Sequence, residues 1–130
     1  MLREDYCDYD TSVALEELGF REPTLAHYME NHPNNLIYHY CDDACVEDCY
    51  RRVSSRDGVF GAPTLYEAQK WLREEHNLHI EITYTPSCWT GKIYDLKEWD
   101  YIKGFTFFKS FEETLHTLIK EAVKILKEEK

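Results

Sequence analysis

The last twenty residues of the chain constrain its fold most strongly. They carry a stripe of apolar side chains that must be buried against a hydrophobic core. Apolar side chains recur there at the i, i+3, i+4, i+7 spacing of one helix face. Ser110 is placed to cap this helix, and Glu113 completes a capping box with it. The sequence therefore predicts a C-terminal helix whose buried stripe comprises Leu115, Leu118, Ile119, Ala122, Ile125 and Leu126.

A second helix and a strand are predicted between residues 61 and 85. Thr64 and Glu67 form a T-x-x-E capping box, and Asn77 is placed to end the helix that follows. The next segment alternates strictly between apolar and polar residues, which is typical of a half-buried strand. Ile80, Ile82 and Tyr84 fall on one face of this strand, and His79, Glu81 and Thr83 fall on the other.

Two further strands, around KIYDL and FTFF, complete the order helix, strand, strand, strand, helix. Each helix has a single apolar stripe to bury, so we expect an antiparallel three-stranded sheet with both helices on one face. The predicted class is α+β. We expect a single domain over residues 1–130, with an acidic helix, strand and loop region at 1–60 and the α-β-β-β-α core at 61–130.

The N-terminal region gives weaker signals. Asp10, Thr11 and Ser12 offer capping oxygens for a short helix, and Gly19 is placed to end it in the left-handed conformation, with Phe20 packing behind. Residues 21–35 are less regular, LIYHYC at 36–41 predicts a strand, and 42–58 predicts a loose loop.

Charge and composition exclude several classes of function. The formal charge is −10, and residues 1–60 carry 13 acidic against 5 basic side chains. A nucleic-acid or anionic-membrane binder needs a basic surface, so neither partner is expected. We find no signal peptide or membrane span and expect a cytoplasmic protein, in which the five cysteines are reduced.

The core order resembles the double-stranded-RNA-binding domain, as does a first helix that begins with Pro63, Thr64 and, further on, Gln69. That family places lysines at the start of its second helix to contact phosphates. The matching positions here are Phe111, Glu112 and Glu113, preceded by Lys109. Carboxylates there repel a phosphate backbone, so the resemblance implies a fold and not RNA binding.

Three segments together resemble a family of small uncharacterised proteins encoded by phages and integrated elements of gut anaerobes. The segments are GFREP, APTLYEAQKWLREEHNLHIEI and FKSFEETLHTLIKEAVKIL. The resemblance spans most of the chain outside roughly residues 40–58. It implies an origin in a mobile element and no particular chemistry.

The segment HYCDDACVEDC is the main candidate for a metal site, because thiolates and imidazole are zinc's preferred ligands. Its C-x3-C-x3-C spacing differs from the usual C-x2-C zinc knuckle, so reduced cysteines in an acidic loop or a partly buried helix are the favoured interpretation. Zinc is therefore an alternative cofactor prediction and no cofactor is the first one. The ligands would be His39, Cys41, Cys45 and Cys49.

Evidence for catalysis is scarce. Cys88 in TPSCWTG has no evident basic partner, and His76 and His79 straddle the junction between a helix and a strand. The common phosphate-binding, zinc-protease and serine-hydrolase motifs are absent. These observations favour a non-enzymatic function and do not decide the question.

Aromatic side chains around the second strand pair suggest association instead. A sheet with helices on one face leaves its other face open, and an exposed aromatic patch there would mark a binding surface. Alternatively, Trp99 and Tyr101 cover the core edge or pack under the N-terminal half. The leading interpretation is an acidic interaction or accessory protein, with a protein partner or a second copy on Trp89, Tyr94, Trp99 and Tyr101.

Overall fold

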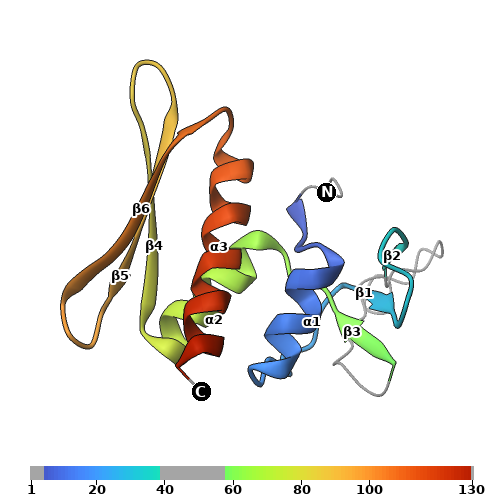
Figure 1. Ribbon diagram of the computed structural model, residues 1–130. Coiled ribbons are helices and arrows are strands. Elements are labelled where there is room, and N and C mark those ends of the chain that lie inside the picture. The colour runs from blue at the N-terminus through green and yellow to red at the C-terminus, as the bar shows by residue number, and fades with distance from the viewer. Residues whose placement is uncertain (1–4, 39–57, 130) are drawn as a thin grey trace, which may run out of the picture. The chain divides into compact units, whose positions relative to one another are not determined.

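The computed structural model describes residues 5–38 and 58–129 of the chain, shown in Figure 1. They divide into two compact units, Met1–Thr64 and Leu65–Lys130, which we call the N-terminal and C-terminal units. Helices and antiparallel sheets occur in both, so the predicted α+β class is confirmed.

The N-terminal unit contains helix α1 (Tyr9–Glu17) and a three-stranded antiparallel sheet of β1 (Ala26–Met29), β2 (Leu36–Tyr38) and β3 (Val59–Gly61). The sheet order is β2-β1-β3. The sequence predicted only part of this sheet. It placed a strand at 36–41, of which 39–41 lie outside the described residues, and it missed β1 and β3. The predicted loop at 42–58 also lies outside them, except for Gly58.

Helix α1 begins earlier than predicted and ends as predicted. Asp8 is the N-cap, and its Oδ1 accepts a hydrogen bond from the Thr11 backbone N–H at 2.9 Å, so the prediction of a cap at residues 10–12 is wrong. Gly19 has φ +105°, and the Phe20 N–H donates to the Leu15 carbonyl at 2.9 Å. This is the left-handed glycine cap that the sequence predicts.

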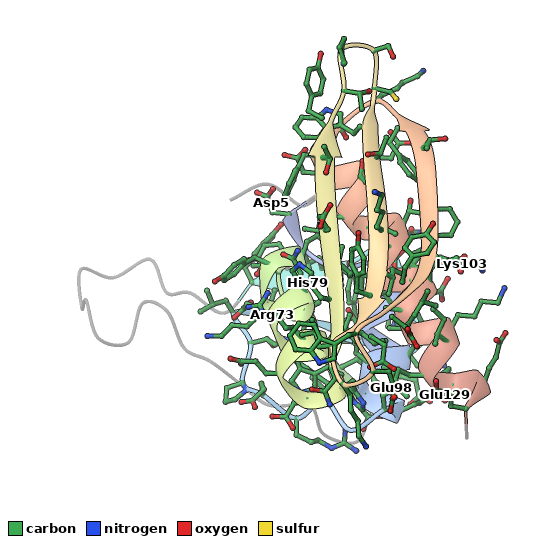
Figure 2. The ribbon with its side chains drawn as sticks, turned by 90° about the vertical axis from the view of Figure 1, so that its left-hand side faces the viewer. Asp5, Arg73, His79, Glu98, Lys103 and Glu129 are labelled. Carbon is green, nitrogen blue, oxygen red and sulfur yellow. The ribbon has the colours of Figure 1, made fainter. Side chains whose placement is uncertain are left out.

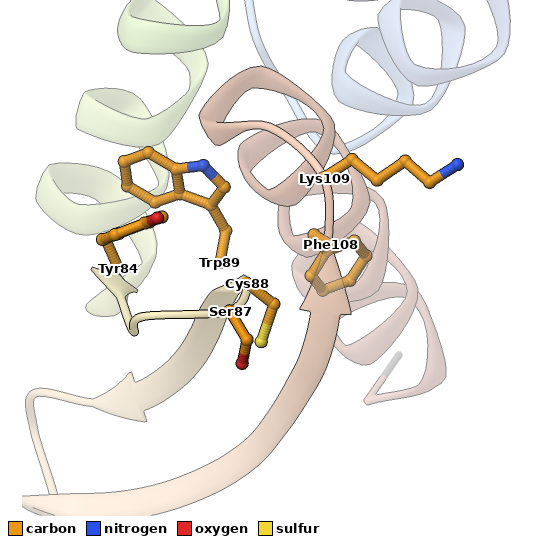
Figure 3. Close-up of a pocket in the computed structure, with 6 residues that line it drawn as sticks. All are labelled: Tyr84, Ser87, Cys88, Trp89, Phe108 and Lys109. Atoms are coloured by element: carbon orange, nitrogen blue, oxygen red, sulfur yellow. The ribbon is translucent and has the colours of Figure 1, made fainter.

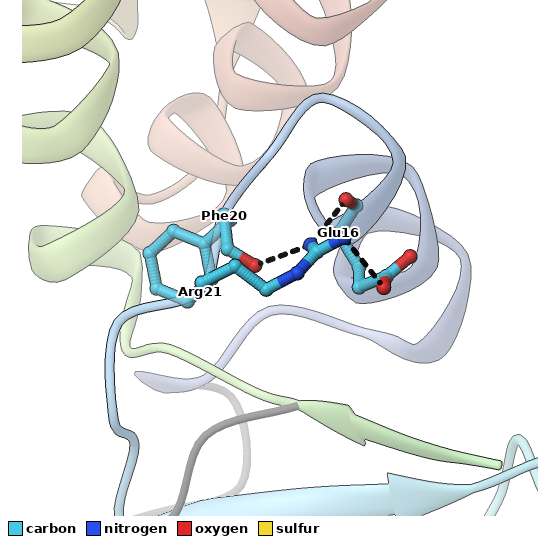
Figure 4. A network of polar contacts seen from close by, with 3 residues as sticks. All are labelled: Glu16, Phe20 and Arg21. Atoms are coloured by element: carbon cyan, nitrogen blue, oxygen red, sulfur yellow. Dashed lines mark hydrogen bonds and ion pairs between the residues drawn. The ribbon is translucent and has the colours of Figure 1, made fainter. Parts of the chain in front are cut away.

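Arg21 forms hydrogen bonds and an ion pair at the end of α1 (Figure 4). Its guanidinium donates to the Glu16 and Phe20 carbonyls at 2.7 and 3.0 Å and lies 3.1 Å from the Glu16 carboxylate. The last carbonyls of a helix have no partner within it, and a nearby cation satisfies them and the dipole.

Tyrosines form most of the small core of the N-terminal sheet. Tyr6, Ala26, Tyr28 and Ala62 are buried together, and Tyr9 meets Tyr28 edge to face at 5.7 Å. The Tyr28 hydroxyl donates to the Cys7 carbonyl at 3.0 Å, which satisfies the polar end of a buried ring.

The C-terminal unit has the predicted α-β-β-β-α order. Its elements are α2 (Leu65–His76), β4 (Leu78–Tyr84), β5 (Trp89–Asp95), β6 (Asp100–Phe108) and α3 (Phe111–Glu128). The strands form an antiparallel sheet in the order β4-β5-β6, and both helices lie on one side of it (Figure 1). The predicted core architecture is therefore confirmed.

Local caps fix the ends of these helices. The Ser110 Oγ accepts from the Glu113 N–H at 3.1 Å at the start of α3, as predicted. Asn77 has φ +57° and ends α2, so that β4 begins at the next residue. Of the predicted α3 stripe only Ile125 is half-buried, and the other five side chains are buried.

Candidate functional site

The sheet of the C-terminal unit has two unlike faces because side chains alternate along each strand. Leu78, Ile80 and Ile93 are buried on the side that carries α2 and α3. Gly91 lies on this side too, and a Cβ there would overlap the buried Leu118 side chain of α3. We call this the covered face. Figure 2 looks onto the opposite side, which we call the uncovered face.

An aromatic row crosses all three strands of the uncovered face. His79 of β4 pairs with Tyr94 of β5, which pairs in turn with Tyr101 of β6. The His79 and Tyr94 rings stack with centroids 6.5 Å apart, and the Tyr94 and Tyr101 rings meet edge to face at 5.9 Å. Cross-strand aromatic pairs of this kind stabilise a sheet. We call His79, Tyr94 and Tyr101 the aromatic row.

The row remains accessible at β6. Tyr101 is 57% exposed, whereas Tyr94 and His79 are half-buried. A register irregularity between Ile93 and Tyr94 places Tyr101 opposite Tyr94, and the Tyr101 ring leans over Gly104. A glycine suits this position because an aromatic side chain can shield its bare backbone.

His79 contains a polar atom without a partner. Its Nδ1 is buried and makes no hydrogen bond with any described residue. A buried polar atom of this kind costs about 1–3 kcal/mol relative to a satisfied one. Within the described part of the chain, the contact that this imidazole makes in the aromatic row is its ring packing on Tyr94.

The rest of the uncovered face is polar but electrically balanced. Glu81 pairs across the strands with Lys92, and Thr83 pairs with Thr90, whose hydroxyl donates to the Thr83 carbonyl at 3.3 Å. Glu81 and Lys92 are exposed, and neither forms an ion pair within the described part of the chain. A chain of formal charge −10 thus presents a face with one acid and one base at its centre.

Trp99 lies at the end of this sheet, in the turn between β5 and β6. Asp95 holds the turn, since its Oδ1 accepts from the Lys97 and Glu98 N–H groups at 2.9 and 3.3 Å. Trp99 itself has φ +61° and is 89% exposed. A left-handed backbone is unfavourable for a bulky residue, and such outliers often occur at functional sites.

Trp89, the fourth predicted surface residue, lies apart from the other three. It alternates with Gly91 and Ile93 on the covered face, and its ring meets Phe111 of α3 edge to face at 5.7 Å. Tyr84 packs on its other side at 4.9 Å. The structure brings Tyr94 and Tyr101 together, places Trp99 in the adjoining turn, and adds His79, which the sequence had grouped with His76.

A hollow of about 420 Å³ lies at the tip of the β4–β5 hairpin (Figure 3), lined by Tyr84, Ser87, Cys88, Trp89, Phe108 and Lys109. The Cys88 Sγ lies 3.4 Å from the Thr85 hydroxyl. The Cys88 and Trp89 side chains point to opposite sides of the strand, and Lys109 points away from both (Figure 3). Among the described residues that line this hollow, none is a carboxylate or an imidazole, the groups that most often activate a thiol.

The remaining predicted candidates divide in two. His76 packs on Trp71 with centroids 4.7 Å apart, whereas His79 packs on Tyr94, so the two imidazoles have different aromatic partners. The predicted metal ligands His39, Cys41, Cys45 and Cys49 lie outside the described residues. Within residues 5–38 and 58–129, no group of three or more His, Cys, Asp or Glu side chains could hold a metal ion.

No helix in the described ranges is both long enough and apolar enough to cross a membrane. Comparison of the chain with protein-family models, with curated proteins and with solved structures found no match.

Proposed function

We propose that this protein is a non-enzymatic interaction module that binds a protein partner through the uncovered face of the β4–β6 sheet. The aromatic row is the observation that carries the proposal, because it places exposed tyrosine on the one sheet face that neither α2 nor α3 covers. Tyrosine gives large contact area at low entropic cost and is enriched in binding surfaces. Trp99 extends this surface at the end of the sheet.

A protein fits this surface better than a nucleic acid does. Lys92 is the central cation of this face and lies opposite Glu81 on the paired strand, and the exposed Glu112 and Glu113 of α3 add negative charge elsewhere on the C-terminal unit. Nucleic-acid affinity depends on neutralising several phosphates, and this distribution of charge opposes it. The resemblance of the sequence to mobile-element proteins supports an accessory role in a phage or integrated element, in the cytoplasm of its host.

Affinity capture from a related host extract tests the proposal. The bait would be the wild-type chain, compared with a Tyr94→Thr/Tyr101→Thr variant, whose threonines keep strand propensity and remove the rings. We expect a stoichiometric protein with the wild type and its loss with the variant. Tyr66→Thr is the matched control, since Tyr66 is 64% exposed on α2, away from the sheet. Equal capture by all three baits would contradict the proposal.

The alternative function is a zinc-binding or thiol-based protein built on His39, Cys41, Cys45 and Cys49. Elemental analysis of protein purified under reducing conditions tests it directly. Stoichiometric zinc that is lost on Cys45→Ala would support this alternative, and a metal-free protein that remains folded would refute it.

A further inference from the structure

We infer that the partner on the uncovered face is a second copy of this chain, packed face to face about a two-fold axis. This inference rests on the proposed function, since it names the occupant of the same surface. A two-fold interface requires a self-complementary patch, in which each residue meets its counterpart's neighbour. The uncovered face has this property in both its charges and its rings.

The central charges carry the argument. Glu81 and Lys92 are neighbours on paired strands, both are exposed, and neither has an ion-pair partner among the described residues. An axis that runs between β4 and β5, parallel to the strands, brings Glu81 of each copy over Lys92 of the other. Two opposite pairs then form at once. A partner surface of uniform charge would attract one of these groups and repel the other.

The same axis also brings aromatic side chains of the two copies together. His79 and Tyr94 occupy β4 and β5 one row away from the charges, so His79 of one copy lies over Tyr94 of the other. Aromatic rings would thus pack on aromatic rings beside the two charge pairs. The threonine row at Thr83 and Thr90 is small and level, which permits two sheets to approach to about 10 Å, the usual spacing of packed sheets.

The area available sets the strength of this association. Because the axis runs between β4 and β5, only these two strands of each copy face each other, and β6 lies outside the overlap. Two strands about 4.8 Å apart and seven residues long cover a footprint of about 230 Å² on each copy, or about 460 Å² for the pair. Burial of Trp99, in the turn that follows β5, would add up to roughly 200 Å² per copy. The total stays below the roughly 1,000 Å² of a stable specific interface, so we expect a weak, transient dimer.

We expect the second copy to bind the uncovered face and not an edge of the sheet, because features of both edges oppose the addition of another strand. At the outer edge of β4, Gln69 of α2 donates to the Ile80 carbonyl at 3.0 Å. At the outer edge of β6, the strand carries two register irregularities and Lys103, which pairs with Glu121 at 3.4 Å. Bulges and lysines are devices that prevent strands from adding to an edge.

A charge exchange followed by sedimentation equilibrium tests the inference. Glu81→Lys and Lys92→Glu each create like charges on the face, and each should weaken self-association at least tenfold. An equimolar mixture of the two variants should associate again as a heterodimer, and so should the double variant with itself. Circular dichroism confirms folding of each single variant, and recovery in the mixture would confirm it independently.

Matched controls lie on α2, outside the sheet. Glu74→Lys and Lys70→Glu make the same changes in net charge at exposed positions and should leave association unchanged. The inference is overturned when the wild type stays monomeric up to roughly 1 mM, a limit that corresponds to negligible affinity. It is also overturned when the single variants dimerise as well as the wild type does.

The capture experiment separates this failure from failure of the proposed function. A monomeric chain that captures another protein, and loses it on Tyr94→Thr/Tyr101→Thr, keeps its interaction function and excludes the second copy as partner. A monomeric chain whose capture is the same for both baits excludes both.

Discussion

The two faces of the β4–β6 sheet are built from the same three strands and differ in how tightly their side chains are packed. On the covered face, Gly91 leaves room for Leu118 of α3, and the addition of one carbon would force a shift. On the uncovered face, Tyr101 leans over Gly104 with more than half of its surface exposed. The comparison teaches that stability depends on the covered face, whereas the uncovered face keeps large rings available for contact.

The uncovered face can present a binding surface without greatly destabilising the fold, because most of its residues are polar. An antiparallel sheet can leave one face in water if that face is polar. Here the polar residues are threonines and one balanced charge pair, with the aromatic row beside them. An exposed ring such as Tyr101 contributes less to folding than a buried one, and its main role is expected in binding.

The largest effect is expected from Leu118→Ala, which removes three buried carbons from the contact between α3 and the covered face. Leu118 is fully buried, so the variant should lose about 3 kcal/mol of unfolding free energy through lost burial and the cavity left behind. Urea denaturation measures the change. Tyr101→Ala on the uncovered face is the comparison and should lose less than half as much. Equal losses would show that the two faces share the stabilising role.

The two glycines of the sheet offer a second contrast. A Cβ at Gly91 would overlap the Leu118 side chain and lie 3.0 Å from Thr114 Cγ2, so Gly91→Ala should destabilise by about 1–3 kcal/mol. A Cβ at Gly104 meets the end of the exposed Tyr101 side chain, which can move. Gly104→Ala should therefore change stability by less than about 1 kcal/mol. The midpoints of denaturant unfolding would contradict this account if their order were reversed.

Trp99→Gly separates stability from binding on the uncovered side. Trp99 has a left-handed backbone and little buried surface, so glycine should raise the unfolding free energy by up to about 1 kcal/mol. Self-association should weaken in the same variant because the interface loses its largest exposed ring. Thermal unfolding and sedimentation, measured on one preparation, report both changes. A variant that is less stable and associates normally would place Trp99 in the fold and not in the interface.

The smallest effect is expected from His79→Phe. The new ring keeps the contact with Tyr94 and removes the buried Nδ1 that lacks a partner, so unfolding free energy should stay unchanged or rise by up to about 1 kcal/mol. His79→Gln is the control, since it places polar atoms in the same position and should not gain stability. A loss above about 1 kcal/mol in the phenylalanine variant would show that the imidazole makes a stabilising interaction.

Most of the C-terminal unit could be predicted from sequence because its signals are local. The Ser110 cap, the stripe of α3 and the alternation from Leu78 to Tyr84 all lie within a few residues of the structures they specify. The third strand was predicted too short. Tyr101 to Gly104 carries a bulge and a glycine, and a bulge interrupts the period of two from which strands are recognised.

The N-terminal sheet was harder to predict because its pairing is not local. Strands β1 and β3 are four and three residues long, and they join His27 to Gly61 across 33 intervening residues. Short strands without strict alternation give no signal of their own. The start of α1 was also misplaced, because Asp8, Asp10, Thr11 and Ser12 all have capping side chains and only the fold selects among them.

Only part of the candidate binding surface could be predicted from the sequence. Trp89 and Tyr94 are five residues apart in one strand, so the period of two already assigns them to opposite faces. The meeting of Tyr94 with Tyr101 depends on the irregular register between β5 and β6, which no local pattern gives. The inclusion of His79 follows from its pairing with Tyr94, which likewise needs the register.

Radical footprinting of the purified chain over a range of concentrations tests most directly whether the uncovered face is an interface. Tyr94 and Trp99 should lose reactivity as concentration rises, whereas Tyr66 on α2, which is 64% exposed, should keep it. That result would place a second copy on the uncovered face. Constant reactivity at Tyr94 and Trp99, or an equal decline at Tyr66, would contradict it.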